Sequence, residues 1–187
     1  MEFRKILVGT DFSEPAARAL AVAAGLAARL DARLVVLSVV DTRGLDGAAM
    51  VPELAGHVDL GALVASLELA AGRRVEQWLA EAKLPPEVRA IAVARRGVPA
   101  ETIVQAAREL EADLIVLGTM GRSGLSRLLF GSVADKVVRT SPVPVLTVGP
   151  KHSGATAPAG SVAASESAAA RSSGPAAAPP PGAPPQS

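Results

Sequence analysis

Short apolar runs alternate with longer amphipathic segments along the first 150 residues of the chain. Few polar residues interrupt the runs, which is typical of strands buried on both faces of a parallel sheet. The runs lie at Ile6–Val8, Leu34–Val40, Val88–Ala94, Leu114–Leu117 and Val143–Val148. We therefore predict five strands at these positions.

Four amphipathic helices are predicted between the strands, and they begin at Ser13, near Leu60, at Pro99 and near Ser132. Ser13 can cap the first helix, and Pro15 suits its first turn. The second helix carries apolar residues mostly at steps of three and four, which indicates one buried face. These residues are Leu60, Leu63, Val64, Leu67, Ala71, Val75, Trp78 and Leu79.

This order of elements predicts an α/β fold: an open, doubly wound, five-stranded parallel sheet of the Rossmann-like kind, with right-handed crossovers. In such sheets, ligands bind beyond the carboxyl ends of the strands, where the strand order reverses. Residues 1–150 are expected to form this single domain. Residues 151–187 are mostly Ala, Gly, Pro and Ser, too poor in large apolar side chains to offset the entropy of ordering, so we predict a disordered tail.

The overall composition excludes several classes of protein. The 19 basic and 18 acidic residues nearly cancel, which argues against a partner such as nucleic acid or an anionic membrane. The absence of cysteine excludes disulfides and thiolate chemistry and agrees with a cytoplasmic location. No apolar segment approaches the roughly 18 residues that a membrane-spanning helix needs.

The segment Gly118–Ser132, GTMGRSGLSRLLFGS, follows the fourth predicted strand and is rich in glycine. Gly118 and Gly121 leave room for a ligand to approach the backbone. Gly131 and Ser132 precede a helix, whose amino terminus attracts anions. Arg122 and Arg127 could add charged hydrogen bonds to a phosphate. The alternative is an ordinary flexible connection with turn and cap residues.

Two other predicted strands end on acidic residues, Asp11 and Asp41. Asp11 either helps to cap the following helix or accepts hydrogen bonds from a ribose or base at the end of the strand. Its expected position, across the switch point from the glycine-rich segment, favours the second reading.

Other nucleotide and catalytic motifs are missing. The chain has no GxxxxGK[ST] loop, and its first turn, VGTDFSEP, has no GxGxxG fingerprint. A phosphoaspartyl receiver needs an Asp after the third strand, where we expect Arg95 and Arg96. His57 and His152 are the only histidines, and no partner is placed beside either, so we expect no catalytic residues and no metal site.

The spacing of the glycines in Gly118–Ser132 resembles the signature of the universal stress proteins, in their ATP-binding subclass. That signature is G-2x-G-9x-G-[S/T], and Gly118, Gly121, Gly131 and Ser132 match it in full. The stretches KILVGTDFSEPAARAL and SVADKVVRTSPVPVLTV also look typical of the family. The resemblance covers residues 1–150 and implies the adenine nucleotide alpha hydrolase-like form of the fold. One small departure is Gly9, where a proline or alanine is common.

The resemblance implies an ATP-binding stress-response module that acts through nucleotide-dependent conformation, and it is compatible with Mg²⁺ accompanying the ATP. The residues that it assigns to the nucleotide are Thr10, Asp11, Val39, Leu117, Gly118, Thr119, Gly121, Arg122, Gly131, Ser132 and Val133. It also implies a homodimer paired through the last strand, Val143–Val148, whose apolar sequence suits an edge that seeks a partner. A nucleotide-independent dimeric scaffold and a slow ATPase remain as alternatives.

Overall fold

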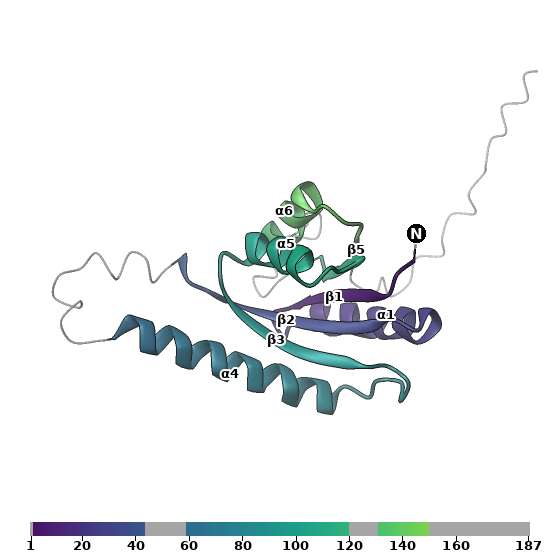
Figure 1. The fold of residues 1–187 in the computed structure, drawn as a ribbon, viewed down its shortest axis with the longest axis horizontal. Coiled ribbons are helices and arrows are strands. Elements are labelled where there is room, and N and C mark those ends of the chain that lie inside the picture. The colour runs from purple at the N-terminus through teal and green to yellow at the C-terminus, as the bar shows by residue number, and fades with distance from the viewer. Residues whose placement is uncertain (1, 44–58, 120–130, 150–187) are drawn as a thin grey trace, which may run out of the picture. The chain divides into compact units, whose positions relative to one another are not determined.

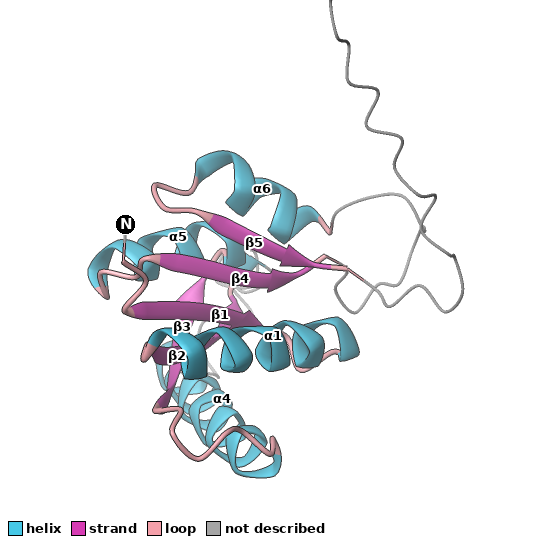
Figure 2. Cartoon of the chain, turned by 90° about the vertical axis from the view of Figure 1, so that its right-hand side faces the viewer, coloured by secondary structure: helices cyan, strands magenta, loops and turns pink. Residues whose placement is uncertain are grey.

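Five parallel strands form one sheet in the computed structural model, which describes residues 2–43, 59–119 and 131–149. The strands are β1 (Lys5–Thr10), β2 (Arg33–Asp41), β3 (Ala90–Gly97), β4 (Leu114–Gly118) and β5 (Val145–Val148). Their order across the sheet is β3-β2-β1-β4-β5. Figure 2 shows β5, β4 and β1 side by side, all pointing the same way. The predicted doubly wound α/β fold is confirmed.

The helices cover the sheet in two layers. They are α1 (Glu14–Leu30), α4 (Leu60–Glu81), α5 (Pro99–Glu109) and α6 (Ser132–Thr140). Figure 1 shows α5 and α6 on one side of the sheet and α4 on the other. Ile6, Val8 and Val36 pack with α1 and α4, whereas Leu7 and Leu37 pack with α5 and α6. Alternate residues of the strands therefore fill two cores, as the uninterrupted apolar runs predict.

The central strands match the predicted burial better than the edge strands do. Residues Ile6–Val8, Leu34–Leu37 and Ile115–Val116 are almost completely buried. On the edge strand β3, Ile91 is 55% exposed, and Arg95 and Arg96 are also exposed. A strand at the edge has a neighbour on one side only, so burial on both faces does not extend to it.

The bounds of β3 and β5 differ from the sequence prediction for reasons that the structure shows. β3 begins at Ala90 because the Val88 N–H closes a turn on the Pro85 carbonyl, at 3.0 Å. It extends to Gly97 because β2 continues beside it as far as Asp41, so Arg95 and Arg96 lie within the strand and not after it. β5 begins at Val145 because Val143 is held in a turn by the Ser141 hydroxyl.

The second helix, α4, does not bury the whole predicted apolar face. Val64 and Val75 are buried, but Leu63 and Leu67 are 39% and 40% exposed. On α6, Val137 is buried and Val138 is 49% exposed. Apolar periodicity thus locates both helices correctly, although it assigns more side chains to the core than the packing accommodates.

Candidate functional site

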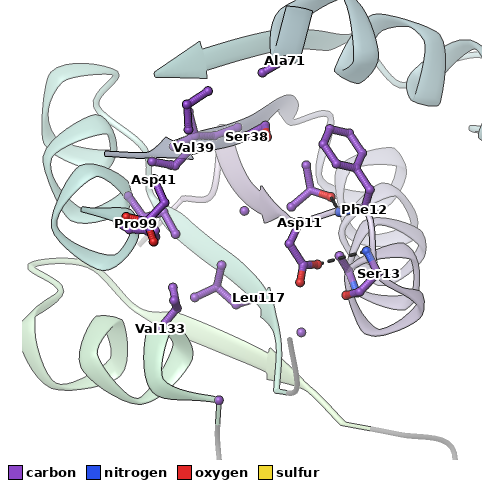
Figure 3. Close-up of a pocket in the computed structure, with 18 of the residues that line it drawn as sticks. Asp11, Phe12, Ser13, Ser38, Val39, Asp41, Ala71, Pro99, Leu117 and Val133 are labelled. Atoms are coloured by element: carbon purple, nitrogen blue, oxygen red, sulfur yellow. Dashed lines mark hydrogen bonds between the residues drawn. The ribbon is translucent and has the colours of Figure 1, made fainter. Parts of the chain in front are cut away.

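A pocket of about 680 Å³ opens at the carboxyl ends of the strands. It lies where β1 and β4 are neighbours although β1 leads to β2 and β4 leads to β5, which is the switch point of the sheet. The ends of β1, β2 and β4, the starts of α1, α5 and α6, and the middle of α4 supply its walls (Figure 3). Its volume falls within the roughly 300–1,000 Å³ of small-molecule sites, at the position where open α/β sheets bind ligands.

The turn after β1 is fixed by its own polar side chains. The Phe12 N–H donates to Thr10 Oγ1 at 2.9 Å, and the Ser13 N–H donates to Asp11 Oδ1 at 3.0 Å. Ser13 in turn caps α1 by accepting from the Ala16 N–H at 3.4 Å. Asp11 therefore holds the turn in front of the helix, as the first reading of its role requires, and it also lines the pocket, as the second requires (Figure 3).

The opposite wall joins the end of β4 to the start of α6. The Thr119 N–H donates to the Val148 carbonyl at 3.0 Å, and the Gly131 N–H donates to the Thr119 carbonyl at 2.5 Å. Gly131 is the N-cap of α6 and, being glycine, has no side chain with which to cap this end of the helix. Ser132 and Val133, in the first helical turn, line the pocket. The first N–H groups of an α-helix lack intrahelical partners and carry partial positive charge, which makes this wall suited to an anion.

The sequence suggests that Gly118 leaves room for a ligand, but in the structure it leaves room for Pro15. A Cβ placed on Gly118 would lie 2.8 Å from the Pro15 carbonyl carbon and 2.9 Å from the Pro15 oxygen. The missing side chain therefore lets the end of β4 pack against the first turn of α1. Gly118 still lines the pocket, so the close packing of two elements, and not only the approach of a ligand, requires glycine there.

Gly9 also leaves room for packing. A Cβ there would lie 2.5 Å from Leu117 Cδ2 and 3.3 Å from Ile103 Cδ1. Both atoms are the ends of flexible side chains, which can move to make room for a larger residue. The glycine found here, in place of the proline or alanine common in the family, therefore changes how Leu117 and Ile103 pack beside the pocket.

Most of the predicted site residues lie together in the pocket. These are Thr10, Asp11, Val39, Leu117, Gly118, Gly131, Ser132 and Val133. Thr119 does not line it, because its backbone and hydroxyl connect β4, β5 and α6. Gly121 and Arg122 lie outside the described residues, as does Arg127.

Sequence reasoning missed the wall that α4 contributes. Leu67, Ala70, Ala71 and Arg74 all line the pocket. Their spacing puts them on one side of the helix, but the same spacing describes a buried face, so the pattern alone could not separate core from pocket. The pocket is therefore more apolar on the α4 side than the strand-end residues suggest.

Asp41 adds a second carboxylate to the lining, at the end of β2. Its Oδ1 accepts from Arg43 Nε at 2.9 Å, and its Oδ2 accepts from the same atom at 3.0 Å. The hydrogen bond from the Arg43 side chain holds the pKa of the Asp41 carboxyl below its usual value, although burial opposes this shift. Asp41 is therefore ionised at neutral pH, and its charge is matched by Arg43.

Two negative findings concern the described part of the chain. In residues 2–43, 59–119 and 131–149, no group of three or more His, Cys, Asp or Glu side chains is placed to hold a metal ion. In the same ranges, no helix combines the length and apolarity needed to cross a membrane.

The fold and the pocket define an α/β protein with a pocket of small-molecule size at the switch point of a parallel sheet. The model of the universal stress protein family matches residues 2–149, and the chain belongs to this family. Universal stress protein MJ0531 of Methanocaldococcus jannaschii is 34% identical over 152 residues, covering 78% of this chain and 82% of that protein.

Two solved structures support the same assignment. Protein MJ0577 of Methanocaldococcus jannaschii is 31% identical over 163 residues. Its structure matches with a TM-score of 0.63 at 27% identity, covering 82% of this chain and all of that one. A universal stress protein in complex with cAMP matches with a TM-score of 0.50 at 26% identity, covering 80% of this chain and 98% of that one.

Proposed function

We propose that the chain binds ATP in this pocket and works as a stress-response module whose conformation depends on the bound nucleotide. One observation carries the proposal: the start of α6, whose N-cap is a glycine, and the acidic residue Asp11 line one pocket from opposite sides of the switch point. Backbone N–H groups at a helix start suit phosphate, and a carboxylate suits ribose hydroxyls. A related protein of the family is known in complex with cAMP, which contains the same base and sugar.

The pocket has two chemically different ends. Gly131, Ser132 and Val133 provide the anion-binding end, whereas Leu67 and Ala71 provide an apolar end. Figure 3 shows Val133 and Ala71 on opposite sides of the pocket. We propose that the phosphates bind at α6 and that adenine lies toward α4, with Asp11 and the backbone of Val39 between them. By its resemblance to the family signature, the segment with Gly121 and Arg122 would complete the phosphate end.

We propose that Mg²⁺ enters with ATP, held by the triphosphate and water. The described residues offer no preformed carboxylate cluster for it, and Asp41 is already paired with Arg43. Both observations fit a metal ion that arrives with the nucleotide rather than one held in a preformed protein site.

We also propose that two copies pair through β5. This strand has a neighbour, β4, on one side only. The Pro144 and Val148 carbonyls accept from Ile115 and Thr119, so they point toward β4. Because peptide groups alternate along a strand, those of Val145 and Thr147 point to the open edge, where a second chain can pair with them.

Calorimetric titration of the full chain, first stripped of bound small molecules, tests the proposed function. We expect ATP to bind at micromolar concentration and more tightly than AMP, because the start of α6 favours added negative charge. A folded sample that does not bind ATP, AMP or cAMP at millimolar concentration would refute nucleotide binding. Tighter binding of cAMP than of ATP would refute ATP as the ligand.

A further inference from the structure

Arg74 of α4 lies against the aromatic ring that follows the end of β1. Its Cζ atom is 4.2 Å from the centroid of the Phe12 ring, within the range of a cation–π contact. The same ring meets Trp78 edge-on, with centroids 5.7 Å apart and planes at 80°. Arg74 and Trp78 are one helical turn apart, so α4 holds the Phe12 ring from two positions.

The backbone of Phe12 is in an unfavourable conformation. Its φ of 64° lies in the left-handed region, which a bulky side chain rarely adopts because the conformation is strained and costs free energy. The hydrogen bond from the Phe12 N–H to Thr10 Oγ1 and the ring contacts with α4 offset this cost. The strained turn therefore has a specific result: it directs the Phe12 side chain toward α4, where the ring contacts the guanidinium of Arg74.

Arg74 is also the sole basic side chain among the described residues that line the pocket. None of the ion pairs within the described part of the chain involves it. Leu67, Ala70 and Ala71 of the same helix line the pocket with it, and Figure 3 shows Ala71 on the side of the pocket opposite Val133, in the first turn of α6. The guanidinium of Arg74 is planar and carries N–H donors at its edge, and apolar residues stand beside it. It therefore suits a planar ring with hydrogen-bond acceptors at its edge.

We propose that Arg74, held in place by Phe12, is a binding contact for the nucleobase. This inference rests on the proposed nucleotide function and extends it. A guanidinium N–H donates to an acceptor on the edge of the purine, while Leu67 and Ala71 cover part of its face. Arg74 thus contacts the base and does not neutralise the charge of the phosphates.

The test compares Arg74→Leu with Arg73→Leu, a matched control: both arginines are exposed residues of α4, but only Arg74 lines the pocket. Adenosine, AMP and ATP each displace a fluorescent ATP analogue from the full chain. A lost hydrogen bond to a charged donor corresponds to a dissociation constant raised about tenfold. We expect this factor to be the same for all three ligands in Arg74→Leu, and Arg73→Leu to change each by less than about twofold.

Arg74→Lys retains the charge and loses the planar fork, so we expect most of the same loss. Wild-type affinity in either Arg74 variant would overturn the inference, as would a factor that grows from adenosine to ATP, since that pattern marks a phosphate contact. These results leave the proposed function standing. Failure of the unaltered chain to bind any of the three ligands would instead refute nucleotide binding, and this inference with it.

Discussion

Replacing Gly118 with alanine tests how the end of β4 is packed. The added Cβ would lie 2.8 Å from the Pro15 carbonyl carbon, whereas ordinary contact begins at 3.4 Å. The obstacle is backbone in the first turn of α1, which Ser13 caps. It cannot turn aside as a flexible side chain can, so either the strand or the helix has to shift by about half an ångström.

Overpacking of this kind costs about 1–3 kcal/mol. For a domain of this size, each kcal/mol lowers the melting temperature by roughly 2–4 °C, so we expect Gly118→Ala to lower it by about 2–12 °C without ligand. Gly25→Ala is the matched control: Gly25 is an exposed position in α1, and a Cβ there meets nothing within 4 Å. Alanine favours a helix over glycine, so the control gains about 0.5–1 kcal/mol.

Differential scanning calorimetry of the full chain measures both changes. We expect the same glycine-to-alanine substitution to lower the melting temperature at Gly118 and to raise it at Gly25. If Gly118→Ala melts within about 1 °C of the wild type and only nucleotide binding suffers, then glycine serves the ligand alone and the packing argument is wrong.

Three further predictions concern the site and the sheet edge. Asp11→Glu displaces the carboxylate and Gly131→Ala crowds the start of α6, so each should weaken ATP binding at least about tenfold. Calorimetric titration measures the affinity, and wild-type affinity in both variants contradicts the proposed site. Thr147→Pro removes an N–H that faces the open edge of β5 and leaves the β4 side intact, so light scattering should report a monomer with an unchanged circular dichroism spectrum, whereas a persistent dimer excludes pairing through this strand. Arg43→Gln removes the group that lowers the Asp41 pKa, so NMR titration should show that pKa rise toward the usual value of about 4, and an unchanged pKa would mean that another group holds the carboxylate.

The sequence alone was sufficient for features that depend on neighbouring residues. The alternation of apolar runs and amphipathic segments predicts the five strands and the four helices α1, α4, α5 and α6 in the described part of the chain. Ser13 caps α1 as its residue type predicts, and Gly131 starts α6. The spaced glycines indicate the family without any coordinates. Strand formation, capping and helix starts follow local chemistry, which is why these predictions are confirmed.

The tertiary structure decided which residues meet across the chain. Only the packed sheet shows that Gly118 makes room for Pro15, that Leu67 faces a pocket and not the core, and that Arg74 lies on Phe12. The edge position of β3 likewise allows Arg95 and Arg96 inside a strand. Periodicity indicates that a side of a helix is apolar, but it carries no information on what lies opposite. That depends on the order and register of strands brought together by long-range packing.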